Sequence, residues 1–381
     1  MKGKNTFSNY VLIGLFLLAL VSPYIQNIFK VIPDVTNTEN RRLADKPVFD
    51  LALLDPFPAK YELYYNDHFA FRNHFVKLFA QENLDVFGKC PYPDQVIIGK
   101  NNELFLVFRE LDTYLNKNLF TNSELNKLRS DFAYRKQYLK DRGVDYYVAL
   151  CPTKYSVYPE RLPWYVKPIY KGSRTDQFVA LLKELDIKVI DIKSAIIKVK
   201  DSIPDQLYRK NDNHWNDLGA FVAYREIMKQ ISKSHPGIRT LQFSDFTITP
   251  NDAEGGNLAI ILNRAKEMRD VTYTFTPKFT STSSVIQKLP YPVPADFEAE
   301  NFFHGFQLAN EKLPKILIFH DSFGNSIQPF IKESFSRSIF IWDKWQYKLN
   351  EPIVEAEKPD IYVTLVLESL LQGLMENCEY K

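Results

Sequence analysis

A short apolar run followed at once by polar residues, Lys315–Asn325 (KILIFHDSFGN), most constrains how this chain can fold. The four apolar residues at 316–319 predict a strand that is buried on both faces, as in a parallel sheet covered by helices. The residues after Ser322 predict a tight turn and a helix. Because ligands collect at the carboxyl ends of parallel strands, Ser322 is expected at a binding edge, near the free N–H groups of a helix start. The alternative is a hydroxyl that only caps its helix.

Strands and helices alternate along much of the remaining chain. Apolar runs predict strands at Val144–Leu150, Lys188–Ile192 and Ile361–Val366, and helical spacing predicts helices at Ser123–Arg142 and Asp217–Ser232. Such alternation is typical of an α/β fold with a mostly parallel sheet.

The N-terminus carries a candidate membrane segment. Lys2 and Lys4 precede the apolar run Tyr10–Val21, which continues less purely to Ile32 after an interruption at Pro23. The basic residues before the run, and the absence of a clear cleavage site after it, favour an uncleaved anchor over a cleaved signal peptide. The rest of the chain is then expected outside the cytoplasm.

Charge and cysteine content narrow the function classes. The chain has 48 basic and 46 acidic residues, a net charge of +2, which gives no basic field for nucleic acid. Cys90, Cys151 and Cys378 are too widely spaced for a metal site, so no metal and no cofactor are expected. One disulfide among them remains open, since the sequence does not select a pair.

A second polar motif, NDNHWN at residues 211–216, supplies what a serine nucleophile requires. Asp212 and His214 are two residues apart, so they can point to the same side of an extended segment or turn. A nucleophilic serine needs a base, and the base needs a carboxylate to orient it. Asn216 is the expected N-cap of the following helix.

The two motifs together resemble the SGNH-hydrolase-like acetyltransferase family of bacterial exopolysaccharide O-acetylation, which includes the alginate O-acetylation proteins. The shared pattern is D-x-H-W upstream of D-S-F. Weaker similarities extend over most of the chain, at Glu39-Asn40-Arg41, Tyr65-Asn66-Asp67-His68-Phe69 with Arg72, Val96–Lys100, and Pro152 to Glu160.

The resemblance implies an α/β/α sandwich of the SGNH-hydrolase type, preceded by an N-terminal membrane anchor. It makes Ser322 the nucleophile, His214 the general base and Asp212 its orienting carboxylate. It also implies a polysaccharide acceptor and an acetyl group delivered by a membrane-bound O-acyltransferase partner. The protein would be a single-pass protein of the inner membrane, with a periplasmic catalytic domain.

The resemblance suggests three parts: residues 1–32 as the anchor, 33–94 as a connector with a helical hairpin, and 95–381 as the catalytic domain. Residues from about 234 to 303 are irregular and are expected to form an insertion with β-hairpin character.

Further residues are expected to bind substrate or stabilise an oxyanion: Phe323, Asn257, Asn325, Lys154, Tyr158 and His320. The N–H of Ser322 or Phe323 is the first oxyanion donor expected, and the side chain of Asn257 or Asn325 the second. His320 replaces a glycine common in SGNH proteins and would place a second imidazole beside the nucleophile. Lys154 and Tyr158 lie in a loop that either faces the site or is an ordinary proline-containing loop.

Three other functions remain open. A carbohydrate esterase would use the same three residues, with water in place of the sugar hydroxyl. A non-catalytic polysaccharide-binding scaffold would keep only the fold. A metal phosphoesterase would use Asp212, His214, His320 and Asp321, but nothing else completes a ligand set at typical spacing.

Overall fold

The computed structural model describes residues 3–33, 42–50, 55–292, 303–343 and 345–378. The chain divides into two compact units, Met1–Pro93 with Ile260–Arg264, and Asp94–Ala259 with Ala265–Lys381. The Glu39-Asn40-Arg41 marker lies outside the described residues.

The first unit contains helices α1 (Gly3–Phe29), α2 (Pro56–His68) and α3 (Arg72–Asp85). Helix α1 continues through Pro23, where the sequence predicted an interruption. Its segment Phe7–Phe29 is, within the described ranges, the one helix long and apolar enough to cross a membrane. At 1.5 Å per residue it would extend about 34 Å, which matches the hydrocarbon core of a bilayer.

A central sheet dominates the second unit, with the strand order β4-β3-β11-β9-β10-β8-β7 among the described residues. Its strands are β3 (Asp145–Cys151), β4 (Lys188–Asp191), β7 (Ser283–Ile286), β8 (Phe303–Leu308), β9 (Lys315–Phe319), β10 (Arg337–Ile341) and β11 (Ile361–Leu367). The strands from β4 to β10 run parallel, whereas β8 and β7 add an antiparallel edge. The predicted mostly parallel α/β sheet is therefore confirmed.

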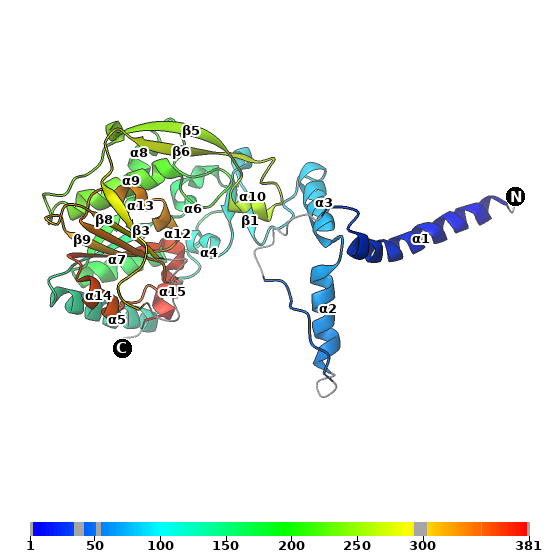
Figure 1. The fold of residues 1–381 in the computed structure, drawn as a ribbon, viewed down its shortest axis with the longest axis horizontal. Helices are drawn as coiled ribbons and strands as arrows, with labels where there is room; N and C mark the ends of the chain where they lie inside the picture. The colour runs from blue at the N-terminus through cyan, green and yellow to red at the C-terminus, as the bar shows by residue number, and fades with distance from the viewer. Residues whose placement is uncertain (1–2, 34–41, 51–54, 293–302, 344, 379–381) are drawn as a thin grey trace. The chain divides into compact units, whose positions relative to one another are not determined.

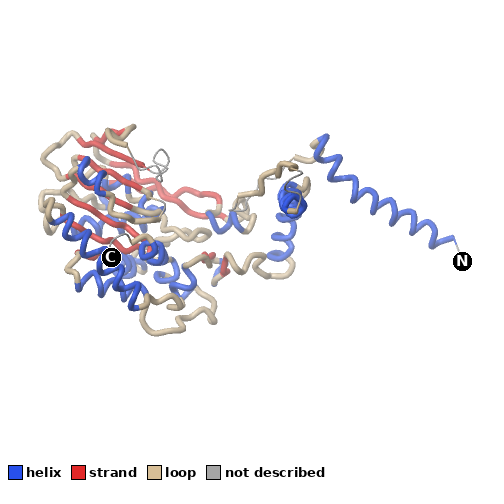
Figure 2. The backbone as a smooth tube through the Cα atoms, turned by 90° about the horizontal axis from the view of Figure 1, so that it is seen from below, coloured by secondary structure: helices blue, strands red, loops and turns tan. Residues whose placement is uncertain are grey.

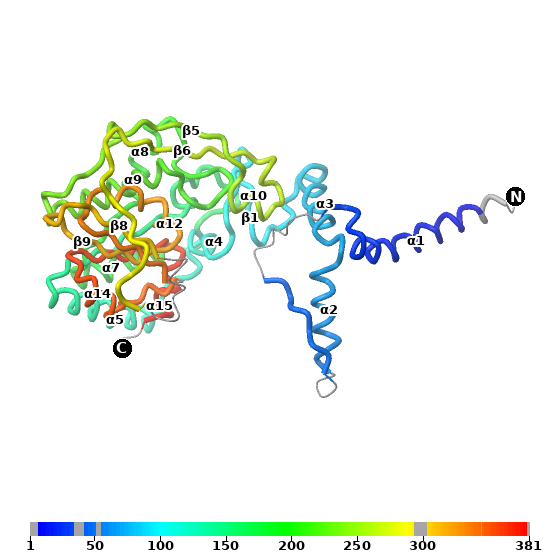
Figure 3. The backbone as a smooth tube through the Cα atoms, in the orientation of Figure 1, coloured from blue at the N-terminus to red at the C-terminus, as the bar shows by residue number. Residues whose placement is uncertain are grey.

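Helices cover both faces of this sheet (Figure 1). One face carries α8 (Ile192–Lys200), α9 (Asp217–Ile231) and α13 (Gln328–Ile331), and the other carries α5 (Asn122–Lys140), α7 (Arg174–Glu184), α14 (Glu351–Glu357) and α15 (Leu371–Glu376). Figure 2 shows the strands between these helical layers. In Figure 3 the C-terminal helix α15 returns to the side of α5, with which it is in contact.

Strand β9 shows why the apolar run at its centre is uninterrupted. Ile316 and Ile318 enter the core under α9, while Leu317 and Phe319 enter the core under α5. All four are essentially inaccessible to solvent. Side chains of a strand alternate between faces, so a strand covered on both sides must be apolar at each position.

Local capping explains where the flanking helices begin. Asn216 caps α9 as expected, because its side chain accepts the N–H of Gly219 at 3.1 Å. Helix α5 begins at Asn122, one residue before the predicted start at Ser123, and Thr121 caps it in a reciprocal capping box with Glu124.

Smaller elements complete the chain. The hairpin of β1 (Val96–Ile98) and β2 (Leu104–Leu106) forms a sheet of its own. The irregular region contains a long hairpin, β5 (Phe246–Glu254) with β6 (Arg269–Pro277), and it also contributes β7 to the main sheet. Short helices are α4 (Glu110–Tyr114), α6 (Lys154–Val157), α10 (Asn257–Ile261) and α12 (Ser322–Asn325), with 3₁₀ turns at Lys100–Asn102, Pro159–Arg161, Phe243–Asp245 and Glu368–Leu370.

Candidate active site

Ser322 stands at the carboxyl edge of the sheet, as the first residue of α12. Strand β9 ends at Phe319, and the polar residues His320 and Asp321 connect it to the helix. Ser322 is partly exposed, whereas the residues on both sides of it are buried. The chain therefore presents this hydroxyl to solvent from a rigid base.

A narrow turn presents Asp212 and His214. Tyr208 pairs with Trp215 in an isolated antiparallel bridge, and the N–H of Arg209 donates to the carbonyl of His214 at 3.1 Å. The residues between these pairs must therefore turn back sharply, which places Asp212 and His214 on the same side. Trp215 is buried against the ring of Phe323, with centroids 4.8 Å apart, so this turn packs onto the helix of Ser322.

The three residues form one continuous chain of hydrogen bonds, called the triad below. Asp212 Oδ1 accepts from His214 Nδ1 at 2.8 Å, and His214 Nε2 lies 2.7 Å from Ser322 Oγ. This carboxylate–imidazole–hydroxyl geometry has the order required to activate a serine by a base that is itself oriented. The described residues thus bring together side chains that are 108 positions apart in sequence.

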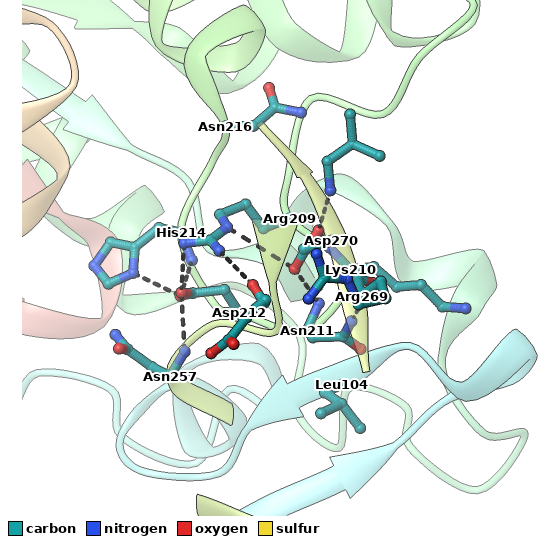
Figure 4. A network of polar contacts seen from close by, with 12 residues as sticks. Leu104, Arg209, Lys210, Asn211, Asp212, His214, Asn216, Asn257, Arg269 and Asp270 are labelled. Carbon is teal, nitrogen blue, oxygen red and sulfur yellow. Dashed lines mark hydrogen bonds and ion pairs between the residues drawn. The ribbon is translucent and has the colours of Figure 1, made fainter. Parts of the chain in front are cut away.

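The second oxygen of Asp212 is held by other donors (Figure 4). Oδ2 accepts the N–H of Asn257 at 3.0 Å and Arg209 Nη1 at 3.4 Å. Burial alone would raise the pKa of Asp212, but the hydrogen bonds from His214 and Asn257 outweigh it and lower the pKa to about 2. The carboxylate is therefore ionised at neutral pH and favours the charged form of the imidazole during proton transfer.

Gly256 allows Asn257 to approach this carboxylate so closely. A Cβ atom added at Gly256 would lie 2.1 Å from Asp212 Oδ2. Any side chain at this position must displace Asp212 or the Gly255-Gly256 loop, so glycine is a steric requirement here.

Asp270 holds the segment that leads into the turn (Figure 4). Its two oxygens accept the N–H groups of Lys210 and Asn211, each at 2.9 Å. The guanidinium of Arg209 lies between Asp270 and Asp212, which places a fixed positive charge behind the triad.

Lys154 supports the same turn through hydrogen bonds to its backbone carbonyl groups. Its buried ammonium donates to the carbonyl oxygens of Arg209 and Lys210 at 2.8 and 2.9 Å, and it is paired with Glu103 at 3.1 Å. Burial lowers the pKa of Lys154 to about 8, although Glu103 favours its charged form. Lys154 is inaccessible to solvent, so the structure places it under the site and not at a substrate-facing position.

Tyr158, the other candidate from this loop, is also internal. Its side chain is buried, and its hydroxyl accepts the N–H of Leu207 at 3.0 Å. Like Lys154, it braces the segment before the triad turn and has no face toward solvent. Of the two readings of the Thr153–Pro168 loop, the structure thus favours the one in which these two side chains are structural.

A buried carboxyl group, Glu110, also contacts the turn that carries Asp212 and His214. Asn213 Nδ2 donates to Glu110 Oε1 at 2.9 Å, and Glu110 Oε2 has no hydrogen-bond partner among the described residues. Burial, with a smaller contribution from the Glu368 carboxylate, raises the pKa of Glu110 to about 8. The sequence analysis missed Glu110, because it lies 103 residues away and belongs to no motif.

Asp321 fixes the start of α12. Its Oδ1 accepts the N–H of Phe323 at 2.9 Å, and its Oδ2 accepts the Tyr347 hydroxyl and the Leu367 N–H, each at 2.7 Å. Burial raises the pKa of Asp321, and these three donors oppose that shift. The bond to Phe323 corrects one expectation: the Phe323 N–H is already used and is not free to bind an oxyanion.

His320 is buried beneath α12. Its Nδ1 donates to the carbonyl of Asp321 at 2.6 Å, and its Nε2 has no partner among the described side chains and backbone. Burial lowers the pKa of His320 to about 4, so the ring is neutral at pH 7. A Cβ atom at Gly324 would lie 2.4 Å from His320 Nδ1, which shows how closely the helix covers this ring.

The two asparagine candidates differ in position. Asn257 is exposed and follows Gly256 directly, with its backbone N–H on Asp212. Asn325 is exposed at the end of α12, and its Oδ1 accepts from Gln328 Nε2 at 3.3 Å. Asn257 therefore borders the triad directly, whereas Asn325 lies one helical turn beyond it.

The fold and the comparisons agree on the class of protein. A mostly parallel sheet between two helical layers, with Ser322 at its carboxyl edge, defines an SGNH-hydrolase-like α/β protein. The family model "SGNH hydrolase-like domain, acetyltransferase AlgX" matches residues 96–288. The chain therefore belongs to the SGNH hydrolase-like acetyltransferase family of AlgX. The matched residues contain the Asp212–His214 turn and end before Ser322.

Solved structures are similar to this chain at low sequence identity. Bacillus cereus PatB1 with a sulfonyl adduct superimposes with a TM-score of 0.55 at 20% identity, covering 74% of this chain and 99% of that one. A DHHW family protein from Eubacterium siraeum DSM 15702 has a TM-score of 0.50 at 16% identity, covering 75% and 100%. The O-acetyltransferase domain of Pseudomonas putida AlgJ has a TM-score of 0.47 at 16% identity, covering 74% and 92%. No curated protein matches this sequence.

Proposed function

We propose that this protein transfers acetyl groups to hydroxyl groups of an extracytoplasmic polysaccharide through an acyl-enzyme on Ser322. The continuous Asp212–His214–Ser322 chain of hydrogen bonds is the observation that carries this proposal. AlgJ, whose solved domain is an O-acetyltransferase, and the AlgX family model supply the acetyl chemistry.

The first half-reaction charges the serine. Ser322 Oγ attacks the carbonyl carbon of an acetyl donor while its proton passes to His214 Nε2. The tetrahedral intermediate then collapses, and the leaving group takes that proton from the imidazolium. Asp212 remains ionised throughout and orients the ring through His214 Nδ1.

The second half-reaction returns the serine. A sugar hydroxyl donates its proton to His214 Nε2 as its oxygen attacks the acetyl carbon, and the proton is then given to Ser322 Oγ as the ester bond breaks. Water in place of the sugar would produce hydrolysis, so transfer depends on a positioned acceptor.

Two donors are proposed for the oxyanion. The N–H of Ser322 has no acceptor among the described residues, which leaves it available at the start of α12. The exposed amide of Asn257, whose backbone N–H donates to Asp212, is proposed as the second donor. Removing one such donor typically costs about 10²–10³-fold in kcat.

We infer that α1 anchors the chain in the inner membrane with the catalytic unit on the periplasmic side. Its length and apolar composition suit a bilayer, and its basic N-terminus favours a cytoplasmic start. Because acetyl groups then have to reach Ser322 from inside the cell, we propose a membrane-bound O-acyltransferase as the donor partner. A reporter fused after Lys381 should be active only outside the cytoplasm, and activity inside would contradict this placement.

The proposed chemistry is tested by Ser322→Ala with Ser232→Ala as its matched control. Ser232 lies just beyond the far end of α9 from the triad turn, and within the described part of the chain its hydroxyl bonds only to the carbonyl of Lys229. Ser322→Ala should abolish acetyl transfer to the polysaccharide in cells, and Ser232→Ala should leave it unchanged. Full acetylation by Ser322→Ala would favour a non-catalytic scaffold.

A further inference from the structure

A cavity of about 510 Å³ lies beside the helix that carries Ser322. It is bounded by the β5–β6 hairpin on one side and by α12, α13 and the start of α9 on the other. Its volume falls within the range of small-molecule sites. All of its lining residues belong to the second unit of the chain.

The cavity is lined by residues that follow Ser322 and His214 closely in the chain. Asn325 lines it and lies three residues after Ser322 on α12, so their Cβ atoms are about 5–6 Å apart. Asp217 also lines it and is the first residue of α9, three residues after His214. The cavity therefore begins about one helical turn from Ser322, although none of the three triad residues lines it.

Aromatic rings form the floor of the cavity. Phe246, Phe275, Phe279 and Phe330 line it and pack edge to face: Phe246 and Phe275 centroids are 5.3 Å apart, and Phe275 and Phe330 centroids 5.1 Å. Such rings offer apolar surface at little entropic cost, because their packing already fixes them. An apolar floor suits the C–H face of a sugar ring.

Two carboxylates with unused acceptor capacity lie at the polar side of the cavity. Glu333 Oε1 accepts the hydroxyls of Ser281 and Ser283 at 2.6 and 3.1 Å, and Oε2 has no donor among the described residues. Its side chain is only 8% exposed. Asp217 Oδ2 accepts the N–H of Tyr273 at 3.0 Å, and Oδ1 likewise has no described donor. Carboxylates only accept hydrogen bonds when ionised, so both positions can accept a hydrogen bond from a hydroxyl or ammonium donor.

The charged side chains that line the cavity determine which kind of sugar it favours. Its charged members are Asp217, Glu333 and Lys332, so carboxylates outnumber the cation. Lys332 Nζ lies 4.0 Å from Glu333 Oε1, so the Glu333 carboxylate already offsets part of the positive charge of Lys332. A sugar carboxylate placed here would face two like charges, and such juxtaposition is costly in a partly enclosed site.

We propose that this cavity is the acceptor subsite and that it binds a neutral or amino sugar unit in preference to a uronate. This inference rests on the proposed acetyltransferase function and specifies its substrate class. The sugar lies with its ring face on Phe275 and Phe279 and donates hydroxyl protons to Glu333 and Asp217. An adjacent unit of the polymer then presents its hydroxyl to Ser322.

Acceptor kinetics on the full-length chain in detergent micelles test the subsite. The donor is an activated acetyl ester, and the acceptors are a neutral glucan oligosaccharide, a chitosan oligosaccharide and an oligogalacturonate. Ser326 lines the cavity, so Ser326→Trp should fill it and raise KM for the neutral and amino acceptors by about tenfold or more, a larger change than in KM for the activated ester. Ser232→Trp, outside the cavity, is the matched control and should change neither value.

Glu333→Gln tests the charge argument with a nearly isosteric change. It should lower KM for the oligogalacturonate about tenfold relative to the glucan, a change in ratio that a purely structural defect would not produce. An unchanged ratio, a wild type that prefers the uronate, or a Ser326→Trp protein with normal KM would overturn the subsite.

Binding to Ser322→Ala separates this proposal from the proposed function. Calorimetry should detect the glucan or chitosan oligosaccharide on Ser322→Ala, and Ser326→Trp added to this variant should abolish binding. If Ser322→Ala binds neither oligosaccharide, the subsite is rejected, even if Ser322 of the wild type forms an acyl-enzyme. Oligosaccharide binding without any acyl-enzyme in the wild type would instead reject the chemistry and keep the subsite.

Discussion

Asp321 Oδ1 accepts the backbone N–H of Phe323 at 2.9 Å, and this bond decides which groups near Ser322 are free. It removes the Phe323 N–H from the expected oxyanion donors. It also fixes the first turn of α12, since the other oxygen of Asp321 is bound to Tyr347 and Leu367. Asp321 thus joins β9, β11 and the serine helix at one buried carboxyl group.

Asp321→Asn should weaken both stability and activity. An asparagine has one acceptor oxygen in place of two, so it cannot accept from the three donors that surround Asp321. We expect the free energy of unfolding to fall by about 1–3 kcal/mol, with a lower kcat for ester hydrolysis. Urea unfolding and hydrolysis rates measure the two effects. A variant with wild-type stability and kcat would show that these bonds do not position Ser322.

Gly256→Ala should reduce activity far more than stability. The new Cβ would overlap Asp212 Oδ2, so the carboxylate must move away from His214. A displacement of about 1 Å can cost about 10²-fold in rate. Gly237→Ala is the matched control, because its Cβ would meet nothing within 4 Å. Equal kcat values for the two variants would argue against the steric role of Gly256.

Glu110 predicts a specific dependence of stability on pH. Its pKa is raised to about 8 in the folded chain from 4.5, so the folded state holds a proton that the unfolded state loses between these values. The contribution of Glu110 to the free energy of unfolding is fully present below about pH 4.5. It is lost as the pH rises through 8, by on the order of 5 kcal/mol, because only the unfolded chain releases the proton between these values. In Glu110→Gln this loss should disappear.

The measurement is urea unfolding at several pH values between 4.5 and 8, for the wild type and Glu110→Gln. Glu267→Gln, at an exposed position, is the control and should follow the wild type. If Glu110→Gln shows the same pH slope as the wild type, the carboxyl group is not protonated in the folded protein.

Short-range patterns carried most of what the sequence could predict. The uninterrupted apolar run of β9 predicted burial on both faces, because strand side chains alternate between two cores. The two-residue spacing of Asp212 and His214 predicted a shared direction, and the N-cap at Asn216 predicted the start of α9. Each of these rests on neighbours within a few residues.

Contacts between distant segments were not predictable in this way. Glu110 reaches Asn213 across 103 residues, and Asp321 reaches Leu367 across 46. Lys154 was expected in a loop that could face substrate, but its ammonium satisfies carbonyl groups that only tertiary folding brings around it. The antiparallel edge of β8 and β7 likewise depends on pairings that local propensity does not specify.

The formation of an acetyl-enzyme on Ser322 is the central claim, and intact-protein mass spectrometry measures it most directly. The full-length wild type incubated with an activated acetyl ester should gain one acetyl group, which peptide mapping should place on Ser322. Ser322→Ala should gain none at this position, and a bound oligosaccharide acceptor should discharge the wild-type adduct. A wild type that transfers acetyl groups without ever carrying one on Ser322 would contradict the account.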